Sequence, residues 1–263
     1  MKRLIIFSCL LILATSGFAQ TEAKSSKALK AEYRRLMDNY YKEQAIFNAP
    51  LEKLSTFEEM AQVKLDASKA PSKRYLPQFK AIARRAEKKG DKAFASEVWL
   101  FIFVFADNGG LAGDDPKTQA EAFEVMTTRF VDTPMLEYLA TYMRSSYYRL
   151  GDQRVTTAEA KLAQIDKVAK SDDVRAAVLI TRAAIIKDNN GPKSQSLALL
   201  DTVLERYPKS KLAASAQMEI YEIVHLSVGC TAPDFEAEDA NGVKFKLTDY
   251  RGRVIVLEFW GFW

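Results

Sequence analysis

Apolar residues recur with the period of an α-helix over most of this chain, from about residue 20 to residue 226. Residues spaced three, four and seven positions apart share one face of a helix, so this pattern predicts a series of amphipathic helices. The segment 92–106 is apolar nearly all round, which indicates a helix that is buried on most sides. The apolar faces predicted for the other helices are Leu29, Tyr33, Leu36, Met37 and Tyr40; Phe79, Ile82, Ala83 and Ala86; Phe123, Met126 and Phe130; Leu136, Leu139, Ala140, Met143 and Tyr147; Leu162, Ile165 and Val168; Ala177, Ile180, Ala184 and Ile185; Leu197, Leu200 and Leu204; and Leu212, Ala216, Ile220 and Ile223.

Prolines, glycines and capping residues predict where these helices begin and end. The clearest predicted loop is 108–116, whose glycines lack the Gly-Lys-Ser/Thr sequence of a phosphate-binding loop. The expected boundaries are a helix start at Pro77 and its end at Gly90, a capping box of Thr156 with Glu159, a cap at Asp172 or Asp173, a break at Gly191-Pro192, and a last helix after Pro208.

The predicted helices are joined by short turns, a pattern typical of arrays of α-hairpins. The stretch 197–223, with Tyr207-Pro208 between its two helices, resembles the joint between tetratricopeptide repeats. The resemblance implies a mainly α, tetratricopeptide-like array over residues 20–226, with a groove that binds a peptide or protein. A packing platform for the domain that follows is the alternative interpretation.

The N-terminus has the three parts of a secretory leader. Lys2 and Arg3 form a short positive region, residues 4–14 are apolar, and small residues up to Ala19 favour cleavage there. The apolar run is shorter than the roughly 20 residues that span a membrane, which argues against the alternative of an uncleaved anchor. We therefore expect residues 1–19 to be a signal peptide and the mature protein to be exported, periplasmic or otherwise extracytoplasmic, with no stable membrane span.

Charge and cysteine content exclude several functions. The formal charge falls from +4 to +2 when Lys2 and Arg3 leave with the leader, and basic residues are mixed with acids along the predicted helices. No nucleic-acid surface is therefore expected. Cys9 lies in the leader, so Cys230 is the one cysteine of the mature chain, and it cannot form an internal disulfide.

The helical part contains little that could carry catalysis. His225 is the chain's one histidine, and both serine-type catalysis and histidine-based metal sites need partners that its sequence neighbours do not supply. The adjacent acids Glu58-Glu59 and Asp114-Asp115 are poor acid–base pairs, because neighbours on a helix do not share a face. We expect no catalytic residue in this part of the chain, no metal site and no cofactor.

The composition changes sharply at Ser227, where the helical period gives way to strand and turn signals. Residues 239–242, Asp-Ala-Asn-Gly, predict a tight turn, and residues 243–247 alternate apolar residues with lysine as in a half-buried strand. Residues 249–253 predict another turn. The run 254–260 is apolar apart from one glutamate, which is typical of a strand buried on both faces.

In their order, these pieces resemble the start of a thioredoxin-like redoxin domain of the TlpA and AhpC/TSA type. The resemblance implies that residues 227–263 are the truncated start of an α/β thioredoxin-like domain, which follows the signal peptide (1–19) and the helical domain (20–226). The matching pieces are Gly229, the loop Ala232-Pro233-Asp234-Phe235, Asp239 with Gly242, the turn from Leu247 to Gly252, and the strand that ends Phe259-Trp260-Gly261-Phe262-Trp263.

In this family a Cys-x-x-Cys pair follows the strand, at a helix N-terminus where the helix dipole lowers the pKa of a thiol. The resemblance therefore implies that the catalytic pair would begin just after Trp263, and Cys230 aligns with neither cysteine. It also implies protein thiols or disulfides, or a thiol reductant, as partners. Glu258 aligns with a buried aspartate that relays protons to the resolving thiol, so it is the candidate catalytic residue. A glutamate open to water, or facing Arg251 or Arg253, is the alternative.

Two functions agree with these features. The first is an exported thiol–disulfide oxidoreductase that is inactive as this 263-residue chain, and a peroxide-reducing enzyme is a variant of it. The second is a helical peptide- or protein-binding module with a vestigial redox domain. Because UGA differs by one base from both cysteine codons and encodes selenocysteine in some organisms, the expected causes of a stop after Trp263 are an artefact, a selenocysteine codon or a functional truncation.

Overall fold

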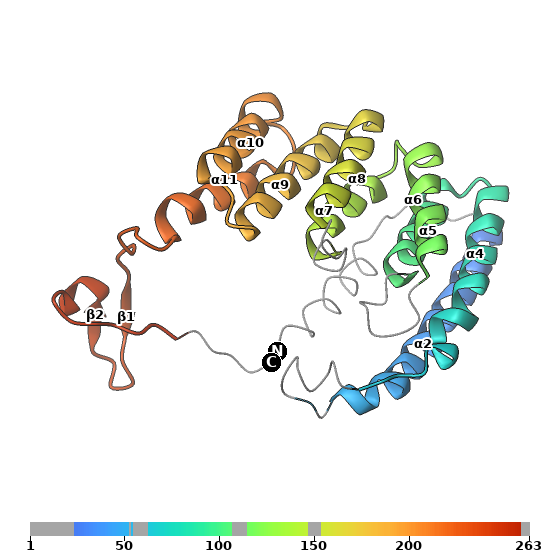
Figure 1. Ribbon diagram of the computed structural model, residues 1–263, viewed down its shortest axis with the longest axis horizontal. Helices are drawn as coiled ribbons and strands as arrows, with labels where there is room; N and C mark the ends of the chain where they lie inside the picture. The colour runs from blue at the N-terminus through green and yellow to red at the C-terminus, as the bar shows by residue number, and fades with distance from the viewer. Residues whose placement is uncertain (1–23, 53, 55–62, 107–114, 147–153, 259–263) are drawn as a thin grey trace. The chain divides into compact units, whose positions relative to one another are not determined.

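The computed structural model describes residues 24–52, 54, 63–106, 115–146 and 154–258, which form two compact units, Met1–Tyr142 and Met143–Trp263. Secondary structure is mainly α, as the sequence predicts (Figure 1). The predicted signal peptide 1–19, most of the predicted loop 108–116, and the acids Glu58, Glu59 and Asp114 lie outside the described residues.

The described residues form α-helices, short 3-10 and π segments, and one two-stranded sheet (Figure 1). None of the helices in these residues is both long enough and apolar enough to cross a membrane. The α-helices are α2 (Lys24–Glu52), α4 (Pro71–Lys88), α5 (Lys92–Ala106), α6 (Pro116–Arg129), α7 (Met135–Ser146), α8 (Arg154–Val168), α9 (Asp172–Asp188), α10 (Lys193–Arg206) and α11 (Ala213–Tyr221). The shorter elements are η1 (Ala67–Lys69), η4 (Glu222–Leu226), β1 (Glu236–Glu238), β2 (Lys244–Lys246) and η5 (Leu247–Tyr250).

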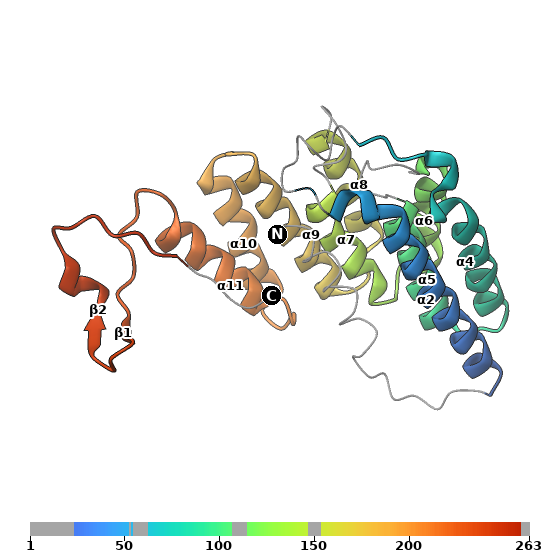
Figure 2. The ribbon, with the colours of Figure 1, turned by 90° about the horizontal axis from the view of Figure 1, so that it is seen from below.

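Helix α5 forms the centre of the first unit, where it packs between α4 and α6, and α2 lies along α4 (Figures 1 and 2). Its uniformly apolar sequence is buried as predicted, and Trp99 and Phe103 are at most 1% exposed. The Phe101 ring stacks on Phe105 with centroids 4.0 Å apart and meets Phe79 of α4 edge-on at 4.7 Å. Such ring pairs add about 0.5–1.5 kcal/mol each beyond burial alone.

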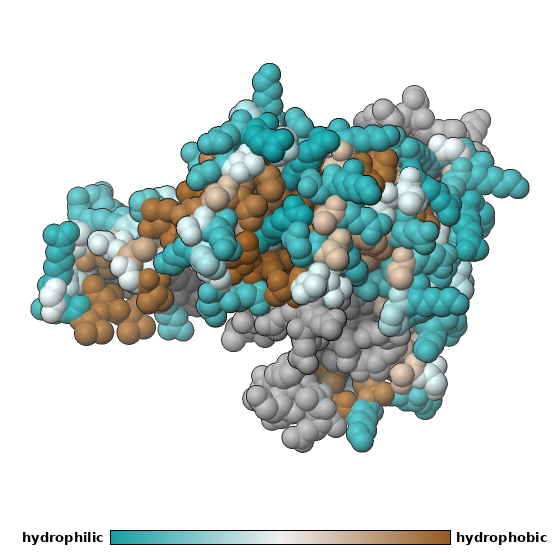
Figure 3. Space-filling model, turned by 45° about the horizontal axis from the view of Figure 1, so that its top comes forward, coloured by the Kyte–Doolittle hydropathy of each residue, from teal (hydrophilic) through white to brown (hydrophobic). Residues whose placement is uncertain are grey.

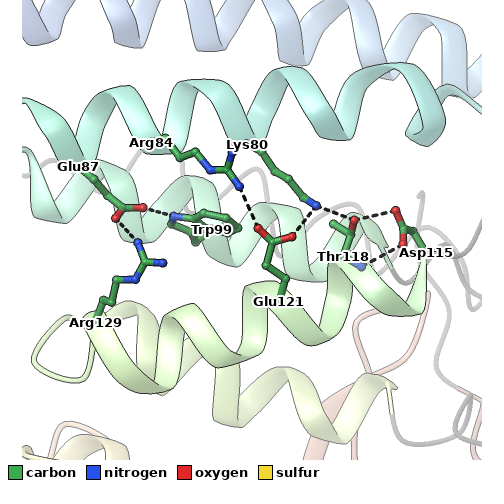
Figure 4. A network of polar contacts seen from close by, with 8 residues as sticks. All are labelled: Lys80, Arg84, Glu87, Trp99, Asp115, Thr118, Glu121 and Arg129. Atoms are coloured by element: carbon green, nitrogen blue, oxygen red, sulfur yellow. Dashed lines mark hydrogen bonds and ion pairs between the residues drawn. The ribbon is translucent and has the colours of Figure 1, made fainter.

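One carboxylate connects the three central helices of this unit (Figure 4). Glu87 of α4 accepts a hydrogen bond from Trp99 Nε1 of α5 at 2.6 Å, and it forms an ion pair with Arg129 Nη1 of α6 at 2.7 Å. A buried indole N–H needs an acceptor, and Glu87 supplies one beside the core. Directed polar contacts therefore orient these helices in addition to apolar burial.

A second set of polar contacts fastens the start of α6 to α4 (Figure 4). Lys80 Nζ of α4 lies 2.8 Å from both Thr118 Oγ1 and Glu121 Oε2 of α6, and Arg84 Nη2 lies 3.2 Å from Glu121 Oε1. Asp115 is the N-cap of α6, where its Oδ1 accepts a hydrogen bond from the Thr118 amide at 2.9 Å. This cap satisfies one of the free amides at the start of the helix.

In the second unit, α9 and α10 pack against each other across a short turn. The Gly191 amide donates to the Ile186 carbonyl at 2.8 Å, and a Cβ at residue 191 would lie 2.6 Å from Ile186 Cγ2, so the turn requires glycine. Ser196 Oγ of α10 donates to the Ala183 carbonyl of α9 at 3.0 Å. The buried apolar core that these helices share with α11 and η4 consists of Ala176, Ala183, Leu200, Val203, Ala216 and Ile223.

Charged side chains link α7, α9 and α11 within this unit. Arg144 of α7 forms ion pairs with Glu219 of α11 at 2.9 Å and with Asp188 of α9 at 3.5 Å. Lys187 Nζ of α9 lies 2.7 Å from Glu219 and 3.1 Å from Glu222. Burial alone would raise the pKa of the Glu219 carboxyl, but Lys187 and Arg144 outweigh burial and hold that pKa below its ordinary value.

The predicted start of a helix at Pro77 is wrong, because α4 begins six residues earlier with Pro71 at its first turn. Tyr75 and Leu76, which precede Pro77, are 4% and 2% exposed. Burying these side chains favours helix upstream of Pro77 and outweighs the backbone hydrogen bond that an internal proline removes.

Two predicted caps are also wrong. Helix α8 begins at Arg154, so Thr156 lies inside its first turn, and the Glu159 carboxylate pairs instead with Arg182 of α9 at 2.7 Å. The cap of α9 is Ser171, whose hydroxyl accepts from the Val174 amide, and Asp172 follows it in the first turn. The helix dipole also favours acidic residues in the first turn. An aspartate near the start of a helix can therefore be either the cap or a residue of the first turn, and the sequence alone does not separate the two.

Other predicted features are confirmed. Gly90 ends α4 with a positive φ of 76°, and the break at Gly191-Pro192 separates α9 from α10. The predicted faces of α4 and α6 are buried, with Phe79 and Met126 both 0% exposed. Tyr147 lies outside the described residues. The tetratricopeptide-like arrangement of the helices stays a prediction.

Candidate functional site

The segment 227–258 follows η4 and carries the sequence features that resemble a redox domain. Its strands β1 and β2 pair antiparallel, with Ala237 opposite Phe245. Opposite charges face each other across the pair, and Lys246 Nζ lies 2.7 Å from Glu236 Oε1. Cross-strand ion pairs of this kind contribute roughly 0.2–1 kcal/mol each.

The turn between these strands is confirmed where the Asp-Ala-Asn-Gly sequence predicts it. Asp239 Oδ1 accepts hydrogen bonds from the Asn241 amide at 2.8 Å and the Val243 amide at 2.9 Å, and Gly242 has a φ of 77°. The Val243 and Asn241 amides lower the pKa of Asp239 by bonding its charged form. An aspartate that caps its own turn and a glycine at positive φ explain why these residues form a hairpin.

A second aspartate ties the loop before β1 to the turn after β2. Asp234 accepts from the Thr248 amide and from Thr248 Oγ1, each at 2.9 Å, and the Leu247 amide donates to the Phe235 carbonyl at 3.2 Å. The hydrogen bond from the Thr248 amide is the main cause of the lowered pKa of Asp234. Sequence reasoning placed Asp234 in a loop but missed this link, because its two ends are 14 residues apart.

Three aromatic rings pack on one side of this hairpin. The Phe245 ring lies edge-on to Phe235 with centroids 6.4 Å apart and to Tyr250 with centroids 5.9 Å apart. Phe245 is the half-buried middle residue of β2, as its alternating pattern predicts, whereas Val243 is 59% exposed and lies outside the strand. The hairpin, the Asp234 link and these rings together form one small cluster within the candidate site.

The predicted buried strand at 254–260 is wrong over the residues that the structure describes. Residues 254–258 form no strand, and Val254 and Val256 are 98% and 87% exposed. A strand that is apolar on both faces is stable only between other strands and under covering helices, and the hairpin supplies neither. Apolar surface therefore gathers on this part of the chain (Figure 3).

Glu258, the candidate proton relay, is exposed in this extended segment. Burial next to a redox pair is what its proposed role requires, so that role stays a prediction. Of its alternative partners, Arg251 and Arg253 are both exposed in the turn before it. Residues 259–263, which carry the rest of the Phe-Trp motif, lie outside the described residues.

Cys230 and His225 are both exposed, and they lie near the end of η4. Cys230 Sγ donates to the Val224 carbonyl at 3.1 Å, and the His225 ring packs against Tyr221 with centroids 4.7 Å apart. Within the described part of the chain, no three His, Cys, Asp or Glu side chains group as a metal site would require. One exposed thiol can enter a mixed disulfide, but a second thiol is needed to resolve it.

Comparison with curated proteins finds relatives for a short part of the chain. Thiol-disulfide oxidoreductase ResA from Geobacillus thermodenitrificans is 53% identical to it over 38 residues, and ResA from Geobacillus kaustophilus is 50% identical over the same length. ResA from Bacillus subtilis is 45% identical over 38 residues. These matches cover 14% of this chain and 21–22% of the relatives, so the chain spans about a fifth of their length.

No family model matches the chain, and no solved structure matches it. The comparisons with family models and solved structures therefore add nothing to the account of the helices, which rests on their packing. Over the matched stretch, the chain is similar to thiol-disulfide oxidoreductases named ResA, and this similarity supports a thioredoxin-like segment.

Proposed function

We propose that this protein is an exported thiol–disulfide oxidoreductase, in which a helical part, residues 20–226, precedes a thioredoxin-like domain that begins near Ser227. The observation that carries the proposal is the identity of 45–53% with ResA over 38 residues. The hairpin and the link from Asp234 to Thr248 support it, because they join residues of the very motifs that resemble the redoxin family.

The chemistry proposed is exchange between a reactive cysteine pair and a protein disulfide. A thiolate attacks one sulfur of the substrate disulfide and forms a mixed disulfide, and the leaving sulfur takes up a proton. The second cysteine of the pair then attacks the mixed disulfide, which releases the reduced substrate and leaves the pair oxidised. A thiol reductant returns the pair to its reduced state.

Cys230 does not fit either role in this exchange. It is the one cysteine of the chain after residue 19, and it precedes the hairpin instead of following the apolar run 254–260. The proposal therefore assigns the reactive pair to sequence beyond Trp263, where the family resemblance places it. The 263-residue chain by itself should lack reductase turnover.

Reduction of insulin tests this assignment. Residues 20–263 are compared with a longer polypeptide from the same gene. In the longer polypeptide the codon after Trp263 is translated as cysteine and translation continues beyond it. Dithiothreitol is the reductant in both reactions. We expect turnover above the dithiothreitol background from the longer polypeptide alone. Turnover by residues 20–263 that persists in the Cys230→Ser variant contradicts the assignment, and so does a longer polypeptide without activity.

Export is proposed from the leader pattern at residues 1–19. A charged start, an apolar stretch and a small-residue exit are the features that secretion machinery recognises. Intact-mass measurement of the native protein should give a mature N-terminus at Gln20. A native protein that retains Met1–Ala19 in a soluble cell fraction would contradict export.

A further inference from the structure

Helix α11 and the π segment η4 that continues it are apolar on their exposed side as well as on their buried side. The buried side belongs to the core of the second unit, where Ala216 and Ile223 are 0% and 4% exposed. Met218 follows Ala216 by two residues, which places it about 200° further round the helix. The large apolar side chains that are exposed on this stretch, here called the outer face, are Met218, Tyr221, Val224 and Leu226.

Charged residues are scarce along α11. Its one charged residue is Glu219, and that carboxylate pairs with Arg144 and Lys187 of the neighbouring helices. The preceding helix α10 carries four charged residues, as is usual for a helix with one side in water. An exposed apolar surface without charges indicates an interaction site, so we expect the outer face to be covered in the whole protein.

A protein surface suits the outer face better than a lipid bilayer does. Helices that lie on membranes carry lysine or arginine on their polar side, whereas α11 and η4 contain neither residue. Methionine and aromatic residues, which here are Met218 and Tyr221, are enriched in protein–protein interfaces. The outer face is therefore assigned to contact with protein.

The chain that leaves η4 is held against the end of that segment. Ser227 Oγ donates to the Ile223 carbonyl at 2.9 Å, and Cys230 Sγ donates to the Val224 carbonyl at 3.1 Å. The Cys230 amide also donates to the Ser227 carbonyl at 3.0 Å, which closes a turn. Residues 227–230, the start of the candidate redox domain, therefore lie next to the outer face.

The connection from this turn to the hairpin is short and stiff. Asp234 is fixed to the hairpin by its bonds to Thr248, so residues 231–233, Thr-Ala-Pro, join the two fixed parts. The four residue steps from Cys230 to Asp234 span at most about 14 Å. Pro233 has a fixed φ and favours an extended residue before it. A domain on so short a connection reaches an effective concentration of about 1 mM at the outer face, well above that of a separate partner.

We propose that the outer face of α11 and η4 is the docking surface of the thioredoxin-like domain of the same chain. The existence of that domain rests on the proposed function, and the inference adds where the domain packs. Met218 and Tyr221 lie in the interface, so the helices and the domain do not move independently. The docking uses no thiol, and its test is therefore separate from the test of reductase activity.

Oxidation of Met218 by hydrogen peroxide tests the docking. The peroxide transfers one oxygen atom to the thioether sulfur and leaves water, and an exposed methionine reacts faster than a covered one. Residues 20–263 are compared with the longer polypeptide in which the codon after Trp263 is translated as serine, so that the reactive pair is incomplete. Mass spectrometry follows the sulfoxide at each methionine. We expect Met218 to react about tenfold more slowly in the longer polypeptide.

Two other methionines serve as controls within each polypeptide. Met37 of α2 is half-buried in the first unit, and its rate should differ by less than about twofold between the two polypeptides. Met126 of α6 is 0% exposed, and its slow oxidation in both polypeptides confirms that they are folded.

Two variants of the longer polypeptide place a charge on or away from the outer face. Tyr221→Glu buries a carboxylate in the interface, so it should return the oxidation of Met218 to within about twofold of its rate in residues 20–263. The matched control is Gln195→Glu, because Gln195 is exposed in the first turn of α10 and is not part of the outer face. It adds the same charge and should leave Met218 protected.

Equal oxidation of Met218 in the two polypeptides overturns the docking, even if the longer polypeptide reduces insulin in its cysteine form. Equal effects of Tyr221→Glu and Gln195→Glu overturn it too. Protection of Met218 in residues 20–263 that increases with protein concentration assigns the outer face to a second copy of the chain, and this also overturns the proposal. A longer polypeptide that protects Met218 but has no reductase activity in its cysteine form supports the docking and contradicts only the redox function.

Discussion

Tyr40 and Tyr75 lie side by side in the aromatic cluster of the first unit, with ring centroids 5.5 Å apart, but their hydroxyl groups differ in what they contact. The Tyr75 hydroxyl donates to Glu43 at 2.7 Å and accepts from Arg74 at 3.0 Å. The Tyr40 hydroxyl is buried and has no hydrogen-bond partner among the residues that the structure describes, and burial raises the pKa of Tyr40. A buried polar group without a partner loses its hydration with no compensation.

Substituting each tyrosine by phenylalanine should therefore have opposite outcomes. Tyr75→Phe removes two hydrogen bonds to charged groups and should lower the free energy of unfolding by about 1 kcal/mol. Tyr40→Phe removes only an unsatisfied hydroxyl and should leave that free energy unchanged or raise it. Urea unfolding of the two variants measures both effects. A Tyr40→Phe variant that is less stable than Tyr75→Phe would contradict this account of the cluster.

Among the helices of the second unit, one carboxylate of α11 faces two cations from other helices. The Glu219 side chain is 20% exposed and pairs with Arg144 of α7 and Lys187 of α9. Its pKa is lowered in the folded state, so this carboxylate contributes stability above its ordinary value of 4.5 and loses it as the pH falls through the folded value. The pKa of Lys187 is raised, because its bonds to Glu219 and Glu222 outweigh its burial.

Glu219→Gln should lower the free energy of unfolding by about 1 kcal/mol at pH 7, because it removes the negative charge that Arg144 and Lys187 share. The variant should also lose less stability than the parent protein between pH 5 and pH 3. Denaturation at several pH values measures both differences. Glu205→Gln is the matched control, since Glu205 of α10 is exposed and makes no ion pair within the described residues. Identical pH profiles for Glu219→Gln and the parent would disprove the role of this carboxylate.

The helices could be predicted from sequence because their signal is local. A period of 3.6 residues reports which face is buried, and the faces that contain Phe79 and Met126 are indeed in the core. Helix starts were harder to predict, since burial of Tyr75 and Leu76 carries α4 upstream past Pro77. Tertiary packing determines where α4 begins, and rules that use only neighbouring residues do not include that packing.

The candidate site was predicted less completely, because its contacts join residues that are far apart in sequence. The turn at Asp239 and Gly242 follows from residue types alone. The bonds from Asp234 to Thr248 span 14 residues, and no spacing rule indicates them. The apolar run 254–260 was predicted as a strand from its composition, but a strand needs partner strands that composition does not supply.

Across the whole molecule, as far as the structure describes it, the longest run of exposed large apolar side chains is Val254–Leu257, which follows the hairpin. A protease binds its substrate as an extended chain, and a segment without paired backbone hydrogen bonds can enter the protease active site directly. A helix must unfold locally before it can be cut. Brief treatment of residues 20–263 with elastase should therefore cut first between Val254 and Leu257. First cuts within α9 or α10 would contradict the exposure of this stretch. The same bonds should become resistant in the longer polypeptide, where added strands and helices cover them.

If the chain carries the start of the thiol–disulfide oxidoreductase domain that we propose, the tryptic peptide that begins at Val254 should extend into the reactive cysteine pair. Trypsin cleaves after Arg253, and no lysine or arginine lies between Val254 and Trp263. The peptide that begins at Val254 in the native protein therefore contains Glu258 and Trp263 together with the residues that follow Trp263. After reduction and alkylation, mass spectrometry should find a Cys-x-x-Cys pair, or selenocysteine in its first position, directly after Trp263. A native peptide that ends at Trp263, or continues without such a pair, would contradict the claim.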